Sequence, residues 1–327
     1  MKILVIQHKA GDRFRTVQYY EALRSKGFEI EDPHWDLSSE WKKYLKKARE
    51  VDVVWIARRM LSFYRLGQLK RANPHIVFDY DDALFLRSSR HGARSSFSKK
   101  NKFRSMIKAA KCVVAGNDYL AEVARKHVPF SKVYLLPTTV NRDWYEDRKE
   151  KKNWEEFTIG WLGSRSTLAY LEKLRPVFLR FNTLGIPWKL MVVSDAFPDW
   201  TDLPLEKITW SLEDEKMSLR KMDIGLNPLS DDAWCLGKCA LKAIQYMAAG
   251  VALVASPVGV NKVLIDNSQL AWSATSDEQW LEAFKEAAAD KQATFQRGVS
   301  SRKWVWDKYT MESQLDNLIT IFEDSVA

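Results

Sequence analysis

The sequence predicts an α/β protein with two doubly wound, parallel-sheet domains of the Rossmann-like kind. Three observations lead to this fold class. The 327 residues are too many for one ordinary α/β core and suit two. Short apolar runs alternate with helical patterns along nearly the whole chain. A polar stretch of both charge signs at 141–156 interrupts that alternation and has the character of an interdomain linker.

The first half opens with a buried strand at 3–6, followed by an amphipathic helix from Thr16 to Lys26 that stops at Gly27, a favourable C-cap residue. A further helix is predicted over 118–126. The remaining predicted strands of this half are 53–56, 76–78, 112–114 and 133–136. We therefore place a first domain at 1–150.

The second half repeats the alternation. Strands are predicted at 158–162, 189–193, 208–210, 224–226 and 251–255, and helices at 168–180, 214–221 and 238–249. A second domain accordingly covers 151–308, and a C-terminal helix at 309–327 is a candidate to return to the first domain. Ligands of doubly wound sheets bind where strands end, so the residues that follow each strand are the candidates for chemistry.

Charge is divided unevenly between the halves. Residues 1–150 hold 31 Lys and Arg against 18 Asp and Glu, whereas residues 151–327 hold 20 against 24. The run from Arg87 to Lys111 contains nine basic residues and no acidic one, with Phe97 and Phe103 among them. This pattern favours contact with an anionic membrane surface or a phosphorylated lipid. A solvated basic surface remains the alternative, and nucleic acid is not expected because no nucleic-acid-binding motif accompanies the run.

Several features indicate a cytoplasmic protein that is peripheral at most to the membrane. No apolar run approaches the roughly 20 residues that span a bilayer. The segment from Met1 to Gln7 enters a strand directly, so we expect no cleavable signal peptide. Cys112, Cys235 and Cys239 are an odd set, for which reduced thiols are the simplest expectation.

The segment from Asp223 to Gly259 carries the strongest signal for a ligand. A strand ends at Asn227, and after a loop that includes Trp234 a helix is predicted to open at Gly237-Lys238. Helix N-termini attract anions, and a lysine adds a full positive charge. Lys238, Lys242 and Gln245 are spaced to share one face of that helix. The alternative is an ordinary solvated face.

Two further groups of residues follow predicted strands. Gly163, Ser164 and Arg165 form a turn that is a candidate cradle for a phosphate or a sugar, although such turns also occur for backbone reasons alone. The acidic group Asp79, Asp81 and Asp82 suggests a divalent metal. We prefer structural or acceptor-binding roles for these acids, in which Asp81 and Asp82 cap the next element or pair with local arginines.

At this point the chain resembles glycosyltransferase family 4, the large retaining family of the GT-B type, and in its first half a bacterial surface-polysaccharide branch. The resemblance covers most of the chain and is most specific over 223–259. The residues that carry it are Gly160-Trp161-Leu162-Gly163-Ser164, Asp223-Ile224-Gly225-Leu226-Asn227-Pro228-Leu229, Gly237-Lys238-Cys239, Gln245-Tyr246-Met247-Ala248-Ala249-Gly250, Val254-Ala255-Ser256-Pro257-Val258-Gly259, Arg13-Phe14-Arg15-Thr16, Phe78-Asp79-Tyr80-Asp81-Asp82 and Ala115-Gly116-Asn117-Asp118-Tyr119-Leu120-Ala121.

The resemblance implies two Rossmann-like domains facing a cleft and a retaining, metal-independent transfer of a hexosyl group. The donor is a nucleotide sugar, used as a substrate and with no cofactor, and the acceptor is a glycan or a lipid-linked molecule. Lys238 is the implied catalytic residue. The implied donor-binding residues are Gly163, Ser164, Arg165, Asn227, Trp234, Gly237, Lys242 and Gln245, and the implied acceptor-side residues are Arg15, Asp81, Asp82 and Asn117.

One departure bears on activity. Many family members carry two glutamates eight positions apart on the donor helix, where this chain has Gly237 and Gln245, and Ser164 stands near the place of an expected arginine. Three rival hypotheses stay open. They are a GT-B epimerase or hydrolase, a degenerate nucleotide-sugar-binding or polysaccharide-binding protein, which this departure favours, and a nucleic-acid-binding protein.

Overall fold

The computed structural model describes residues 1–7, 12–87, 96–146 and 155–327, which form two compact units. The first unit combines Met1–Asn141, Asp232–Cys239 and Met311–Ala327, and the second combines Arg142–Asp231 and Ala240–Thr310. The predicted boundary between residues 150 and 151 lies outside the described residues. The first unit is thus assembled from three separate pieces of the chain.

The first unit is built on a parallel six-stranded sheet in the order β2-β1-β3-β4-β5-β6. Its strands are β1 (Lys2–Ile6), β2 (Glu29–Glu31), β3 (Val53–Ala57), β4 (Ile76–Tyr80), β5 (Cys112–Ala115) and β6 (Val133–Leu135). Its α-helices are α1 (Tyr20–Ser25), α2 (Trp41–Ala48), α3 (Phe63–Ala72), α4 (Phe97–Ala109), α5 (Asp118–Arg125), the short α9 (Ala233–Leu236) and α14 (Met311–Val326).

The central strands of this sheet are buried on both faces, which explains why they are nearly continuous apolar runs. Successive side chains of a strand point to opposite faces. Ile3 and Val5 therefore enter one hydrophobic cluster, and Leu4 and Ile6 enter another.

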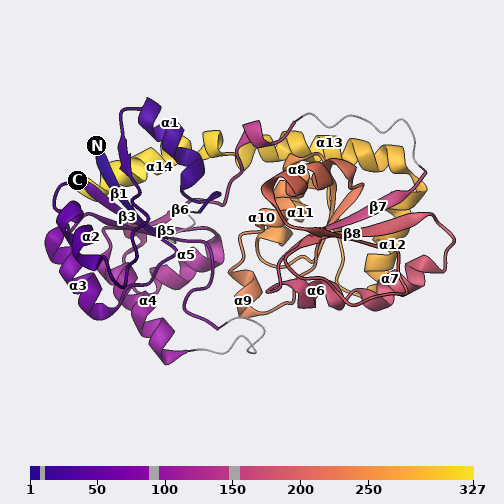
Figure 1. Ribbon diagram of the computed structural model, residues 1–327, viewed down its shortest axis with the longest axis horizontal. Helices are drawn as coiled ribbons and strands as arrows, with labels where there is room; N and C mark the ends of the chain where they lie inside the picture. The colour runs from indigo at the N-terminus through magenta and orange to yellow at the C-terminus, as the bar shows by residue number, and fades with distance from the viewer. Residues whose placement is uncertain (8–11, 88–95, 147–154) are drawn as a thin grey trace. The chain divides into compact units, whose positions relative to one another are not determined.

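Helix α14 covers one face of the first sheet although it lies at the C-terminal end of the chain (Figure 1). Leu318, Ile321 and Phe322 are fully buried there. The ring of Phe322 meets the indole of Trp55 on β3 edge-on, with centroids 5.2 Å apart. The predicted C-terminal helix is thus part of the first unit's core.

The second unit is built on another parallel six-stranded sheet, in the order β12-β11-β10-β7-β8-β9. Its strands are β7 (Phe157–Leu162), β8 (Trp188–Ser194), β9 (Leu205–Thr209), β10 (Ile224–Asn227), β11 (Ala252–Ala255) and β12 (Trp272–Ser273). Its α-helices are α6 (Leu168–Glu172), α7 (Arg175–Asn182), α8 (Leu212–Lys221), α10 (Leu241–Ala248), α11 (Val260–Ser268), α12 (Asp277–Ala289) and α13 (Lys291–Lys308).

The predicted fold class is confirmed, and two helices differ in detail. The helix expected over 168–180 is divided into α6 and α7, with Pro176 in the first turn of α7. The helix expected to start at Lys238 starts at Leu241, because Ala240 adopts a left-handed conformation with φ of 53°.

Two expectations, about membrane-spanning segments and about the cysteines, can be compared with the structure. No helix among the described residues is both long enough and apolar enough to cross a bilayer. Cys112, Cys235 and Cys239 are buried free thiols, as predicted.

Candidate functional site

Each sheet reverses the direction of its strand order at one point. This point lies between β1 and β3 in the first unit and between β7 and β10 in the second. Loops at the carboxyl ends of the strands diverge there and make room for a ligand. The residues that follow these four strands are therefore the ones to compare with the predicted site.

The turn after β7 in the second unit is closed by its own hydrogen bonds. A Cβ atom on Gly163 would lie 1.7 Å from the indole of Trp161, so the glycine makes room for that ring. The amide of Gly163 donates to Val193 O at 3.0 Å, and that of Ser164 donates to Thr167 Oγ1 at 3.1 Å. The amide of Arg165 donates to Asp195 Oδ1 at 2.6 Å. A phosphate at this turn would therefore meet side chains rather than these three backbone amides.

Lys242 reaches the same turn from the first turn of α10. Its Nζ donates to Thr167 Oγ1 at 3.0 Å and lies 5.1 Å from the ring centre of Trp161. Because Thr167 Oγ1 also accepts the amide of Ser164, the structure brings the predicted residues Ser164 and Lys242 together. Helix α10 has no side-chain cap at its N-terminus. Its first-turn amides and Lys242 thus concentrate positive potential beside this turn.

The predicted residue Gln245 lies one turn further along α10 and is buried. Its Nε2 donates to Glu215 Oε1 at 3.0 Å, and Trp210 Nε1 donates to the other oxygen of Glu215 at 2.9 Å. Sequence reasoning missed Glu215. A signal was available, because Ser211 caps α8 directly after β9 and thereby places the first turn of that helix at the carboxyl edge of the sheet.

Asn227, predicted to bind the donor, is instead held inside the second unit. Its Nδ2 donates to Asn261 Oδ1 at 2.7 Å, and its carbonyl accepts Asn261 Nδ2 at 3.2 Å. Asn261 is fully buried on α11. The pair ties the end of β10 to α11, which is a structural role.

The segment Asp232–Cys239 of the first unit holds two predicted donor-binding residues, Trp234 and Gly237, and the predicted catalytic residue Lys238. Asn117, which caps α5, donates through Nδ2 to the carbonyls of Leu236 and Lys238 at 3.2 and 3.1 Å. A Cβ atom on Gly237 would lie 2.7 Å from Cβ of Ala83, so this glycine allows close packing. Trp234 is half-buried under Lys238, whose Nζ lies 4.9 Å from the ring centre.

Lys238 therefore does not share a helix face with Lys242 and Gln245, and that prediction was wrong. Its Nζ lies 3.0 Å from Asp82 Oδ1. Within the first unit, the predicted catalytic residue Lys238 thus lies beside Asp82 and Asn117, two predicted acceptor-side residues.

Arg58 organises the acidic residues of the first unit, and sequence reasoning missed it. It follows β3 in a left-handed conformation with φ of 56°. Its guanidinium lies 2.8 Å from Asp12, 2.8 Å from Asp81 and 2.7 Å from Asp82. Burial raises the pKa of Asp81 to about 6, although the positive charge of Arg58 opposes the rise. The predicted pairing of Asp81 and Asp82 with an arginine is confirmed, but that arginine follows another strand and is not a near neighbour in the sequence.

Arg15 lies beneath this cluster and does not line an open surface, contrary to its predicted acceptor-side role. The side chain is 1% exposed, and its Nε lies 2.7 Å from Asp79 Oδ1. Its Nη1 donates to the carbonyls of Leu136 and Pro137 at 2.6 and 3.1 Å. Arg15 therefore connects β4 to the chain that follows β6. Among the described residues, no group of His, Cys, Asp or Glu is arranged to hold a metal ion.

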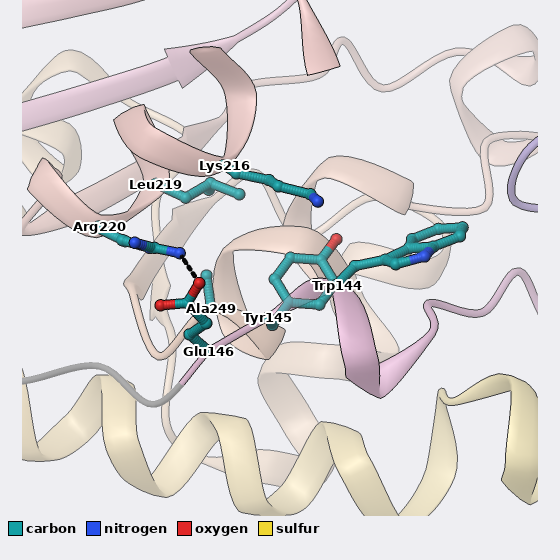
Figure 2. Close-up of a pocket in the computed structure, with 7 residues that line it drawn as sticks. All are labelled: Trp144, Tyr145, Glu146, Lys216, Leu219, Arg220 and Ala249. Atoms are coloured by element: carbon teal, nitrogen blue, oxygen red, sulfur yellow. Dashed lines mark ion pairs between the residues drawn. The ribbon is translucent and has the colours of Figure 1, made fainter. Parts of the chain in front are cut away.

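The second unit also contains two hollows. Figure 2 shows the smaller, of about 20 Å³, across which Glu146 and Arg220 pair at 2.5 Å; it has room for little more than one water. The larger, of about 220 Å³, lies where β10, β11 and β12 end and suits a group the size of a monosaccharide. Its lining is Tyr170, Lys173, Leu174, Pro228, Leu229, Ser256, Thr275, Asp277 and Trp280.

Comparisons with known proteins agree with this architecture. No protein-family model matches the sequence, and no curated protein sequence matches it. Among solved structures, sucrose-phosphate synthase from Thermosynechococcus elongatus is 13% identical over 98% of both chains, with a TM-score of 0.68. Anabaena HepE in complex with UDP and glucose is 12% identical over 99% of both chains, with a TM-score of 0.69. WaaG, a glycosyltransferase involved in lipopolysaccharide biosynthesis, is 12% identical over 98% of this chain and 100% of that chain, with a TM-score of 0.68. The fold is therefore that of GT-B glycosyltransferases.

Proposed function

We propose that this GT-B chain is a glycosyltransferase that moves a hexosyl group from a nucleoside-diphosphate sugar to a glycan or lipid-linked acceptor. The observation that carries the proposal is the uncapped N-terminus of α10, with Lys242 in its first turn beside the turn after β7. Helix N-termini and lysines at such a point bind phosphate groups.

On the donor side, Lys242 and the first amides of α10 would hold the diphosphate and stabilise the charge that develops when it leaves. Glu215 and Gln245 would face the ribose, because a carboxylate and an amide both bind hydroxyl groups. Arg165, exposed after β7, is a further contact for a phosphate. HepE has been solved with UDP and with UDP-glucose, which makes uridine nucleotides the first class to test.

Lys238 is the second candidate cation for the leaving group. Because its ammonium is paired with Asp82, it would have to exchange that carboxylate for a phosphate oxygen. Lys242 lies in the first turn of α10, where the helix amides add to its positive charge. We therefore assign the larger part of donor binding to Lys242 and keep Lys238 as the candidate catalytic residue.

The proposed reaction is retaining and needs no metal ion. The acceptor oxygen forms a bond to the anomeric carbon on the face from which the diphosphate departs, as the bond to the phosphate oxygen breaks. The acceptor's hydroxyl proton passes to that departing oxygen. Lysine and helix amides would stabilise the leaving group in place of a divalent cation.

The reaction is proposed to occur in the cytoplasm at the inner face of the membrane. The support is the basic first half together with Phe97, which is 81% exposed at the start of basic helix α4. Basic helices with exposed aromatic residues bind anionic lipid surfaces. Part of the basic run, 88–95, lies outside the described residues.

A second candidate function has one observation in its favour. The packing of Gly237 against Ala83 leaves no room for a larger side chain, so a carboxylate cannot stand at the position where the family resemblance expects one. A protein that binds nucleotide sugars without transferring them is consistent with this loss.

The test is a thermal-shift panel of UDP, GDP, ADP, TDP and CDP with their sugars. A ligand at 100 times its Kd stabilises by about 2.7 kcal/mol. We expect one nucleotide class to raise Tm in the wild type and to lose about tenfold or more in affinity in Lys242→Ala. Lys262→Ala, which removes an exposed lysine on α11 of the same unit, is the control and should match the wild type.

Release of the free nucleoside diphosphate separates the candidate functions. Acceptor-dependent release supports transfer. Binding without release under any acceptor supports the binding protein, and the absence of any thermal shift in folded protein would reject the donor site itself.

A further inference from the structure

A cavity of about 360 Å³ lies between α4 and α5 of the first unit, and none of the predicted donor-binding residues lines it. Figure 1 shows both helices beside the first sheet. Its size falls within the range of small-molecule sites. The lining residues are Phe85, Leu86, Lys100, Phe103, Arg104, Tyr119, Val123, Lys126 and His127.

The floor of this cavity is apolar and well packed. The rings of Phe85 and Phe103 lie 5.0 Å apart, and those of Phe85 and Tyr119 lie 6.4 Å apart. Phe103 and Phe85 are buried, which holds their rings in place, while Val123 and Tyr119 are half-exposed. A hydrocarbon chain that enters the cavity would therefore meet a rigid apolar surface.

The rim carries positive charge, and no carboxylate lines it. Lys100 and Arg104 lie one turn apart on α4, and Lys126 and His127 follow the end of α5. No Asp or Glu is among the lining residues, and Lys100, Arg104 and Lys126 form no ion pair with any described residue. Like charges one turn apart destabilise a helix slightly. The arrangement is thus not explained by stability.

The titration of His127 agrees with this geometry. Burial, together with the positive charges of Arg104, Lys108 and Lys126, lowers the pKa of its imidazole. Three cations from both helices therefore act on the same point of the rim. An anion is the ligand that would relieve their repulsion.

We propose that this cavity binds one phosphorylated lipid, with the phosphate at Lys100, Arg104 and Lys126 and the hydrocarbon chain over Phe85, Phe103 and Val123. The apolar floor should make a phosphorylated lipid bind more tightly than inorganic phosphate, because inorganic phosphate has no hydrocarbon chain to place on it. The site does not depend on donor binding or on sugar transfer.

Titration calorimetry with dihexanoyl phosphatidic acid, kept below its micelle concentration, tests the proposal. We expect it to bind at least about tenfold more tightly than inorganic phosphate or dihexanoyl phosphatidylcholine. Arg104→Gln/Lys126→Gln should weaken binding by about tenfold or more, because each phosphate contact is a charge-assisted hydrogen bond.

The matched control is Lys42→Gln/Lys46→Gln, which removes two exposed lysines from α2 of the same unit and should leave binding unchanged. A third variant, Val123→Glu, brings a carboxylate to the lip of the floor and should abolish binding while Tm stays near the wild-type value. Equal losses in both double variants would show a diffuse charge effect and overturn the proposal. So would inorganic phosphate binding as tightly as the lipid, or displacement of the lipid by a short oligonucleotide.

Discussion

The two switch points of this molecule hold cations in different ways. In the first unit, Arg58 and Lys238 are surrounded by the carboxylates of Asp12, Asp81 and Asp82. In the second unit, Lys242 is held by the hydroxyl of Thr167 and the face of Trp161.

This difference shows that the net charge of each half of the chain does not predict which charged groups lie at its switch point. The first half of the chain is strongly basic, yet the groups named at its switch point are three carboxylates and two cations. The second half is slightly acidic, yet its switch point holds Lys242 beside the N-terminus of α10. The basic excess of the first half lies elsewhere, on helices such as α2 and α4.

The largest expected effect concerns the buried pair beneath the first switch point. Arg15→Ala leaves Asp79 buried without its cation and should destabilise the protein by about 3–5 kcal/mol. Urea denaturation followed by circular dichroism measures this change. Lys2→Ala, which removes one partner of an exposed pair with Glu29, is the control and should cost less than about 1 kcal/mol. Similar losses in the two variants would contradict the role given to Arg15.

A smaller effect is expected where the segment Asp232–Cys239 packs on the first unit. Gly237→Ala places a methyl group 2.7 Å from Cβ of Ala83 and should cost about 1–3 kcal/mol. Gly67→Ala on α3, where nothing lies within 4 Å, should instead stabilise by up to about 1 kcal/mol. Thermal denaturation should show a lower Tm for Gly237→Ala and an unchanged or higher Tm for Gly67→Ala. An unchanged Tm in Gly237→Ala would mean that the segment is held loosely.

The smallest effect tests whether Asp82 restrains Lys238. Pairs with this degree of exposure contribute up to about 1 kcal/mol. If Lys238 meets the donor phosphate, Asp82→Asn should raise the affinity for the nucleoside diphosphate severalfold, and the gain should vanish in Asp82→Asn/Lys238→Ala. An unchanged affinity in the single variant would leave Lys242 as the lysine that binds the donor.

The fold was predictable because its determinants are local. Strands buried on both faces must be apolar throughout, so the runs predicted at 53–56 and 112–114 coincide with strands β3 and β5 to within one residue. The pairing of Asp81 and Asp82 with an arginine was also predictable, since buried carboxylates need partners. The sequence did not indicate that this arginine would be Arg58. Arg58 is distant in sequence and itself adopts a left-handed conformation after β3.

The candidate site was harder to predict because tertiary contacts decide it. Gly237 fits a phosphate-binding opening as well as it fits close packing, and only the position of Ala83 distinguishes the two. Nothing in the periodicity of 238–249 reports the left-handed Ala240 that delays α10 to Leu241. Glu215 meets Gln245 from another helix, which a search along one helix face does not reach.

The docking of α14 has a consequence for the order in which the protein matures on the ribosome. The first unit's sheet is translated by residue 141, but the apolar face around Trp55 stays uncovered until Phe322 has been added. At about 5–20 residues per second, that interval lasts roughly 10 to 40 s. The second unit, complete at residue 310, can finish folding first. The beginning of this chain is thus the last part to be covered, and until then its apolar face stays exposed to solvent.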